Sequence, residues 1–191
     1  MSNDSYKSES ICAISSPPGI GGVSLIRISG PESFSIVEKI FSKSLKDTSG
    51  YQVLYGKIVE KKKIIDDVIV TVFKNPNSFT GENTVEVNCH GSTFIQQKII
   101  ELLINNGARL ALPGEFSKRA FLNGKLDLSQ TEAIADLINS KSSAAHEIAI
   151  KQLKGGISSE LKILRNKLIE FASLIELELD FSEEDVEFAD R

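Results

Sequence analysis

Three charged residues stand in otherwise apolar or turn-rich segments, and their side chains suit the binding of a polar heterocycle. Arg27 is the one charged residue in the run 23–28, and its guanidinium group is a fork that pairs with a carboxylate or a carbonyl. Glu86 lies in the alternating run 84–89, and a carboxylate accepts two parallel hydrogen bonds from a ring N–H and an adjacent amino group, as a pterin or guanine offers. Lys125 follows an Asn-Gly pair as a third candidate charge. In each case the ordinary alternative, a solvent-facing side chain, stays open.

The glycine-rich stretch SSPPGIGGVSLIRISG at residues 15–30 is the segment most suggestive of phosphate binding. A Walker-type loop needs G-x-x-x-x-G-K-[ST], in which backbone N–H groups, a lysine and a hydroxyl hold phosphates and magnesium. Here no lysine follows the glycines, and the residues after Gly22 read as a strand where a phosphate loop would open a helix. We also expect that no helix N-terminus faces this loop to hold an anion. We therefore predict that the glycines form a tight connection between two adjacent strands.

The cysteine, histidine and serine patterns give little indication of a metal site or a nucleophile. Cys12 and Cys89 do not form a disulfide framework, and His90 and His146 are the two histidines of the chain. The acidic residues near the Cys-His pair lack the spacing of metal ligands, and no G-x-S-x-G motif is present. We predict no metal site and no catalytic residue in this chain.

The elements that must position the three charged residues follow from short apolar runs and turn signals. Strands are predicted at 11–16, 22–29, 51–60, 64–73, 84–89 and 108–112, with a lysine-tipped hairpin at 61–63. A helix is predicted from Pro31 to Phe41, and a short helix over 113–125. A longer amphipathic helix is predicted over 91–107, and its inward residues are Phe94, Ile95, Ile99, Leu102 and Leu103.

The chain changes from mixed elements to helices at Pro113. Ser129 and Glu132 have the spacing of a capping box, which predicts a helix that runs to about Leu153 and is broken at Gly155–Gly156. Beyond Ser158 an apolar stripe needs a partner helix, and its members are Leu161, Leu164, Leu168, Phe171 and Ile175. The fold class is thus an α+β domain with a mixed or antiparallel sheet, followed by an α-helical segment. The predicted domains are 1–118 and 119–191.

Composition and charge are typical of a water-soluble globular protein. The chain has 191 residues, of which 41% are hydrophobic and 25% are charged, and it lacks both a long apolar run and a signal-peptide core. We expect a cytoplasmic location, where cysteines stay reduced. The net charge is -4, and residues 176–191 hold eight acidic residues and one arginine, so the remainder is only mildly basic. This balance excludes the strongly basic field of a free-standing nucleic-acid binder.

Three segments, taken together, resemble the N-terminal region of the tRNA-modification GTPase family MnmE, also called TrmE. They are PPGIGGVSLIRISG, NSFTGENTVEVNCHGS and LPGEFSKRAFLNGKLDLSQTEAIADLI, and the third is the most diagnostic. The resemblance spans nearly the whole chain. It implies a folate-binding domain similar to that of the glycine-cleavage aminomethyltransferase, followed by the start of a helical domain. The G domain of the family is missing, so we expect a part of a longer protein that ends before the GTPase domain.

The resemblance also implies which residues contact a reduced folate. The arginine of RISG is Arg27, the glutamate of the strand after FTGE is Glu86, and the lysine of FLNxK is Lys125. We expect Glu86 to pair with the pterin N–H and amino group, and the two cations to pair with the carbonyl or the glutamate carboxylates. The family's C-terminal C-x-G-K motif has no counterpart here. The family's sites for GTP, magnesium and potassium would lie outside this chain.

The function implied by the resemblance belongs to the intact protein. Such a protein, together with its FAD-dependent partner MnmG (GidA), installs a 5-aminomethyl or 5-carboxymethylaminomethyl group on the wobble uridine of certain tRNAs. A reduced folate, 5-formyltetrahydrofolate or methylenetetrahydrofolate, would be the one-carbon donor, and GTP hydrolysis would drive a conformational change. The N-terminal domain would form a homodimer. We expect no GTP hydrolysis by this chain itself.

Two other interpretations remain compatible with the residues. One is a stand-alone folate-dependent aminomethyltransferase, which would need its own acid or base residue and a larger chain. The other is a purely structural dimerisation module with an inactive pocket. Titration with a reduced folate separates a folate-binding portion of a tRNA-modifying GTPase from the structural module.

Overall fold

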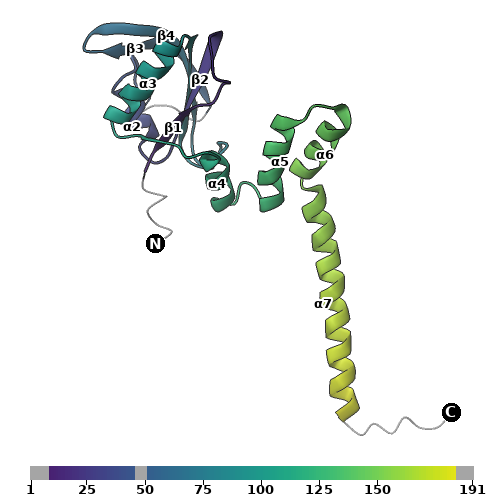
Figure 1. Cartoon of the computed structure of the whole chain (residues 1–191). Coiled ribbons are helices and arrows are strands. Elements are labelled where there is room, and N and C mark those ends of the chain that lie inside the picture. The colour runs from purple at the N-terminus through teal and green to yellow at the C-terminus, as the bar shows by residue number, and fades with distance from the viewer. Residues whose placement is uncertain (1–8, 46–50, 184–191) are drawn as a thin grey trace, which may run out of the picture. The chain divides into compact units, whose positions relative to one another are not determined.

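The computed structural model describes residues 9–45 and 51–183, and the chain divides into two compact units, Met1–Leu126 and Asp127–Arg191. The division lies beyond the boundary at residue 118 that the sequence suggested. The reason is helix α4 (Glu115–Leu122), which is bound to the loop 74–83. Arg119 in the helix hydrogen-bonds to Glu82, and Asn123, directly after the helix, hydrogen-bonds to Thr80. The predicted short helix over 113–125 is confirmed, and it belongs to the first unit. Figure 1 shows the elements of both units.

The first unit is built on a six-stranded mixed sheet. Its strands are β1 (Ile11–Ile14), β2 (Gly21–Ser29), β3 (Gln52–Glu60), β4 (Lys63–Phe73), β5 (Thr84–Gly91) and β6 (Arg109–Leu110). The strand order is β3-β4-β5-β2-β1-β6, in which β1 and β6 are parallel and the other neighbours are antiparallel. The predicted α+β class with six strands is therefore confirmed, although the last strand is only two residues long.

One face of the sheet forms the core with helices α2 (Ser33–Glu38) and α3 (Thr93–Asn105), which lie on the same side of it (Figure 1). Alternation of side chains along each strand creates the two faces, because successive residues point to opposite sides. The fully buried aliphatic side chains of the core include Ile26, Ile28, Ile58, Val70, Val72, Val85, Val87, Val37, Ile99 and Leu103. The other face carries Arg27 and Glu86.

One residue of the inward face predicted for helix α3, Phe94, does not point into the core. Ile99, Leu102 and Leu103 are buried as expected, but Phe94 is 67% exposed. Gln96 takes the inward position of the first turn, and its side chain donates a hydrogen bond to the Gly19 carbonyl. Position 94 lies roughly 200° around the helix from position 96, and so it faces solvent.

Two further boundaries in the first unit differ from prediction. Helix α2 begins at Ser33 and ends at Glu38, so Pro31 lies in the preceding turn and Phe41 lies beyond the helix, although Phe41 is buried. The predicted hairpin of β3 and β4 is confirmed, and its turn places Lys61 and Lys62 at positive φ values of 45° and 72°. Both lysines thus adopt the backbone region that two-residue hairpin turns require.

The second unit contains three helices, α5 (Leu128–Asn139), α6 (Ser143–Leu153) and α7 (Gly156–Glu183). The predicted capping box at Ser129 and Glu132 is wrong: Asp127 caps α5 and forms the box with Gln130. The single predicted helix to Leu153 is also interrupted, because Ser142 caps a new helix by accepting a hydrogen bond from the Ala145 N–H. Aspartate and glutamine fill the two capping positions as well as serine and glutamate do.

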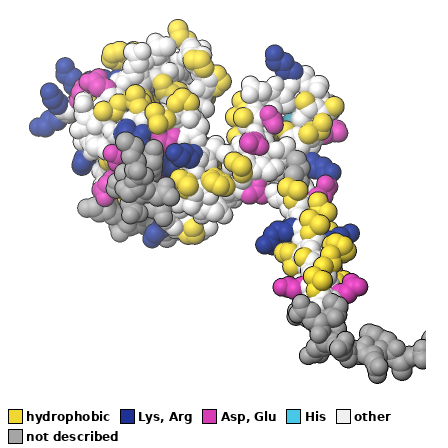
Figure 2. All heavy atoms as spheres, turned by 60° about the horizontal axis from the view of Figure 1, so that its bottom comes forward, with side chains coloured by type: hydrophobic (Ala, Val, Ile, Leu, Met, Phe, Trp, Pro, Cys, Tyr) yellow, Lys and Arg dark blue, Asp and Glu magenta, His cyan; other side chains and the backbone are white. Residues whose placement is uncertain are grey.

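Helix α7 carries the apolar stripe that the sequence predicted. Leu161, Leu164, Leu168, Phe171 and Ile175 are all exposed. Figure 2 shows hydrophobic side chains along this helix with charged side chains among them. Within the described part of the chain, no helix combines the length and the apolar character needed to cross a membrane. The last eight residues of the acidic segment, 184–191, lie outside the described residues.

Candidate functional site

Arg27 and Glu86 form an ion pair on the sheet face opposite the core helices. They are register partners on the neighbouring strands β2 and β5. Arg27 Nε lies 2.8 Å and Nη2 lies 2.7 Å from the same oxygen, Glu86 Oε1. The two side chains are 22% and 19% exposed, so the pair is partly withdrawn from water yet can be reached from solution. In the part of the chain that the structure describes, Glu86 Oε2 accepts no hydrogen bond.

Two aromatic rings lie against the guanidinium group of Arg27. The Arg27 Cζ atom is 5.2 Å from the ring centre of Phe79 and 5.6 Å from that of Phe116. Phe79 lies in the loop 74–83 between β4 and β5, and Phe116 lies in the first turn of α4. Both distances are within the range of a cation–π interaction. Analysis of the sequence missed these rings, although each belongs to a motif that it quoted, FTGE and PGEF.

Lys125 is not brought into contact with this pair. Its aliphatic stem lies beside Gly81, where an added Cβ would meet Lys125 Cγ at 3.0 Å. The side chain is exposed and makes no ion pair with any described residue. Lys125 therefore lies against the loop that carries Phe79, beside Gly81, which is two residues after Phe79. The structure brings two of the three predicted residues together and places the third against the loop.

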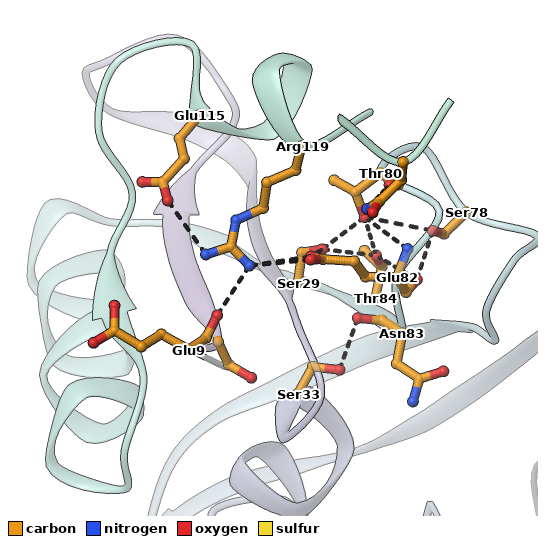
Figure 3. Close-up of polar contacts among 12 residues, drawn as sticks. Glu9, Ser29, Ser33, Ser78, Thr80, Glu82, Asn83, Thr84, Glu115 and Arg119 are labelled. Atoms are coloured by element: carbon orange, nitrogen blue, oxygen red, sulfur yellow. Dashed lines mark hydrogen bonds and ion pairs between the residues drawn. The ribbon is translucent and has the colours of Figure 1, made fainter. Parts of the chain in front are cut away.

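Buried hydroxyl groups anchor the loop 74–83 to the sheet. Ser29 Oγ donates to Glu82 Oε2 at 2.7 Å and shares a hydrogen bond of 2.7 Å with Thr80 Oγ1 (Figure 3). Ser78 Oγ donates to the Glu82 backbone carbonyl at 2.6 Å, and the Asn123 side chain donates to the Thr80 carbonyl at 2.8 Å. These contacts give the loop a defined position over the end of β2, next to Arg27.

Glu115, the first residue of α4, is bound by a second arginine. Arg109 Nη2 and Nη1 lie 2.7 Å and 2.9 Å from its two carboxylate oxygens, and the Leu112 N–H donates to it at 2.8 Å. These partners, Arg109 first, hold the pKa of this buried carboxyl at about 2, although burial alone would raise it. Glu115 is therefore a permanent anion at neutral pH, and it fixes the start of the helix that carries Phe116.

The open sheet face extends beyond the ion pair in both directions. A hollow of about 310 Å³ includes Ala13, the register partner of Arg27 on β1, and Phe116. Another hollow of about 320 Å³ includes Asn88, the next residue after Glu86 on the same face of β5, and exposed apolar side chains such as Val23 and Ile69. The pair is thus flanked by space that an extended ligand or another protein surface can enter.

The glycine-rich loop connects β1 and β2, which are antiparallel neighbours, as the sequence predicted. The first turn of α3 lies beside this loop, where the Gln96 side chain donates to the Gly19 carbonyl. Gly91 packs directly on Gly21, where a side chain would collide with the Gly21 backbone. The glycines thus serve the close approach of two backbones at the start of β2.

The cysteines are buried within the fold, and His90 is paired with Asp66. Cys12 and Cys89 are buried, free thiols whose pKa values are raised to about 11 by burial. The His90 ring Nδ1 lies 2.6 Å from Asp66 Oδ1, and Asp66 also accepts the His90 backbone N–H. Among the described residues, no group of three histidine, cysteine or acidic side chains is arranged to hold a metal ion.

The fold and this site define a class of protein: an α+β domain with one open sheet face, followed by a separate helical unit. Residues 10–125 match the family model described as GTP-binding protein TrmE N-terminus, and residues 128–191 match the model of the MnmE helical domain. Because the first match covers more than half of the chain, the chain belongs to the TrmE (MnmE) family, as its motifs indicated.

Several relatives carry the description tRNA modification GTPase MnmE. The chain is 55% identical over 188 residues to the one from Parabacteroides distasonis, a match that covers 95% of this chain and 41% of the relative. It is 54% identical to the one from Cytophaga hutchinsonii and 56% identical to the one from Flavobacterium johnsoniae, each match covering 96% of this chain and 40% of the relative. The chain thus spans about two fifths of the length of these relatives.

Proposed function

We propose that this chain is the folate-binding and dimerising part of a tRNA-modification GTPase, and that the Arg27–Glu86 pair is the centre of its folate site. Family membership and the description of the relatives support the overall function. The observation that carries the site is the partly buried ion pair whose guanidinium group has two aromatic rings against it. This combination of a carboxylate, a guanidinium group and two rings suits a flat heterocycle with amide-like edges.

The residues present fit a reduced folate by their chemistry. Glu86 Oε1 is held by Arg27, and Oε2 accepts no hydrogen bond from the described residues, so the carboxylate is oriented and still has acceptor capacity. A pterin edge presents a ring N–H beside an amino group, which are the two donors that such a carboxylate binds. Phe79 and Phe116 offer ring faces against which the pterin ring can pack. Lys125, on the neighbouring loop, suits the more exposed glutamate tail of the ligand.

In the intact protein the bound folate would supply the one-carbon unit for the modification of the tRNA wobble uridine. We propose that Arg27 and Glu86 bind and orient it, while GTP hydrolysis and the FAD-dependent partner MnmG act through parts of the protein outside this chain. The substrate would be tRNA, and the product would carry a 5-aminomethyl or 5-carboxymethylaminomethyl group. This chain provides the ligand site and the platform, and the GTPase motifs are not in its sequence.

The proposed homodimer would form through the open face of the sheet. That face presents exposed apolar side chains on three strands: Val23 on β2, Val53 and Tyr55 on β3, and Ile69 on β4. An exposed group of apolar side chains is typical of a protein interface. The second hollow, beside Val23 and Ile69, lies in this face. A dimer there would also shield the edge of the folate site from water.

Calorimetric titration with 5-formyltetrahydrofolate tests the folate site. Glu86→Gln keeps the shape of the side chain but presents an amide donor where an acceptor is needed. A hydrogen bond to a charged group contributes about 1.5–3 kcal/mol, so we expect the affinity to fall about ten- to a hundredfold. The matched control is Glu101→Gln on α3, an exposed glutamate paired with Lys98, which should bind as the unmodified chain does. Unchanged affinity in folded Glu86→Gln would place the pterin elsewhere, and no binding by the unmodified chain would favour the structural module.

A further inference from the structure

Arg119 is a buried arginine that joins three separate segments of the first unit. Its side chain is 3% exposed, and its Nη1 atom donates to the Glu9 backbone carbonyl at 2.9 Å. The same nitrogen lies 3.2 Å from both carboxylate oxygens of Glu82, and Nη2 lies 3.2 Å from Glu115 Oε1. Figure 3 shows the guanidinium group between the two carboxylates. One side chain thus connects the loop 74–83 with helix α4.

The two segments that Arg119 connects are the ones that carry the rings against Arg27. Phe79 precedes Glu82 by three residues in the loop, and Phe116 directly follows Glu115 in α4. The loop between Phe79 and Glu82 is short and internally bonded, since the Glu82 N–H donates to Thr80 Oγ1 at 3.2 Å. A shift of Glu82 would therefore move Phe79, and a shift of α4 would move Phe116.

The charges of Arg119, Glu82 and Glu115 indicate that Arg119 fixes the positions of the groups it joins more than it adds net stability. Without Arg119, two partly or fully buried carboxylates, Glu82 and Glu115, would lie near each other with like charge. A buried ion pair adds little net stability compared with an apolar replacement, but it specifies one arrangement of the groups it joins. Arg119 Nε is itself buried and has no hydrogen-bond partner among the described residues, so the cluster is not optimised for stability alone.

We propose that Arg119 is a positioning residue that holds Phe79 and Phe116 against Arg27 and so keeps the ligand site formed before a ligand arrives. The ligand side of this inference rests on the proposed folate function, whereas the ring geometry does not. Arg119 touches neither Arg27 nor Glu86 through any hydrogen bond in the described structure, and it acts through the loop and α4.

A tryptophan reporter measures the ring geometry without any ligand. The chain contains no tryptophan, and Phe79 is 37% exposed, so Phe79→Trp places a single emitter at the site with room for the larger ring. In this background we expect Arg119→Lys, which keeps the charge but lacks the planar fork, to shift the emission to longer wavelength and to increase quenching by acrylamide. The reverse exchange at the adjacent exposed position, Lys118→Arg, is the matched control and should leave the emission unchanged.

The affinity for 5-formyltetrahydrofolate gives the second readout, without the reporter. If the rings stay in place in only about a tenth of the molecules, the apparent affinity of Arg119→Lys falls about tenfold, with Lys118→Arg unchanged. Glu82→Gln keeps the side-chain volume and weakens the same contact from its other end. This variant should also shift the tryptophan emission and weaken folate binding. It provides the test if circular dichroism shows that Arg119→Lys does not fold.

The outcomes separate this inference from the proposed function. A loss of thermal stability in the folded variants with unchanged emission and unchanged affinity would overturn the positioning role. A changed emission together with absent folate binding in the unmodified chain would support the positioning of the rings and contradict the folate site. A changed emission with weakened folate binding supports both.

Discussion

Arg27 directs two nitrogens, Nε and Nη2, at one oxygen of Glu86, at 2.8 Å and 2.7 Å. The two residues are therefore one unit on adjacent strands, whereas the sequence suggested that Glu86 pairs with the pterin N–H and amino group and Arg27 with the carbonyl or the glutamate carboxylates. Arg27 orients the Glu86 carboxylate through Oε1, and the second oxygen, Oε2, accepts no hydrogen bond from the described residues. This contact changes the expectation for Arg27 itself.

The loss of Arg27 should affect folate binding as much as the loss of the Glu86 carboxylate. We expect Arg27→Ala and Glu86→Gln each to weaken binding of 5-formyltetrahydrofolate about ten- to a hundredfold, and the double variant to weaken it little further, because residues in contact are not additive. Calorimetry on the three variants measures this coupling. Losses that simply add in the double variant would mean that the two side chains bind different parts of the ligand.

The stability of the first unit should depend on pH through Glu115. Its pKa is lowered from 4.5 to about 2, with Arg109 as the main cause. A lowered folded-state pKa contributes stability that is complete above the ordinary pKa and is lost as the pH falls from about 4.5 toward 2, at most about 3 kcal/mol. Urea unfolding at several pH values should show this loss of stability. In Glu115→Gln the free energy of unfolding should vary less with pH over the same range. The control is Glu60→Gln, which changes a more exposed carboxylate paired with Lys98. This variant should lose stability between about pH 4.5 and 2 as the unmodified chain does.

Gly91, the last residue of β5, and Gly22, in β2, should respond differently to replacement by alanine. A Cβ on Gly91 would collide with the backbone of Gly21, whereas a Cβ on Gly22 would meet nothing within 4 Å. We expect Gly91→Ala to lower the free energy of unfolding by about 1–3 kcal/mol, and Gly22→Ala to change it by less than about 0.5 kcal/mol. Thermal unfolding followed by circular dichroism measures both. Equal stability of the two variants would contradict the close packing of Gly91 on Gly21.

Self-association should depend on the open sheet face. We expect the chain to be a dimer at micromolar concentrations by sedimentation, and Val23→Glu with Ile69→Glu to make it monomeric, because buried unpaired carboxylates oppose association. Leu164→Glu on the exposed stripe of α7 is the control, and it should leave that dimer intact while it reduces nonspecific association. A dimer that survives the first pair and is lost with Leu164→Glu would move the interface to α7.

The chain should bind no GTP. Its sequence contains no phosphate loop, and its glycine-rich segment joins two adjacent strands. Equilibrium titration with a fluorescent GTP analogue in the presence of magnesium and potassium should therefore show no saturable binding. GTP hydrolysis in the presence of the chain should be no faster than in buffer alone. Stoichiometric binding would contradict the assignment of the GTPase motifs to other parts of the protein.

The predictions that held are those that depend on local signals. Strands β2, β3, β4 and β5 follow from alternation and β-branched residues, and the hairpin at Lys61–Lys62 follows from two apolar runs separated by a short polar turn. The helical second unit follows from apolar spacing. The errors arose where two local patterns competed: Asp127 and Gln130 took the capping box expected of Ser129 and Glu132, and Ser142 started a new helix within a continuous apolar pattern.

The sequence by itself determined the family, the α+β class and the identity of Arg27 and Glu86 as candidate binding residues, because motifs, alternation and turn signals are written in neighbouring residues. The tertiary structure decided that these two side chains pair across 59 residues of chain, since that depends on β5 lying next to β2 in the sheet. It also decided that the rings of Phe79 and Phe116 lie against Arg27, and that Lys125 lies against the loop 74–83 instead. Such contacts arise when distant segments share one core, and their energies depend on burial and geometry that no local pattern encodes.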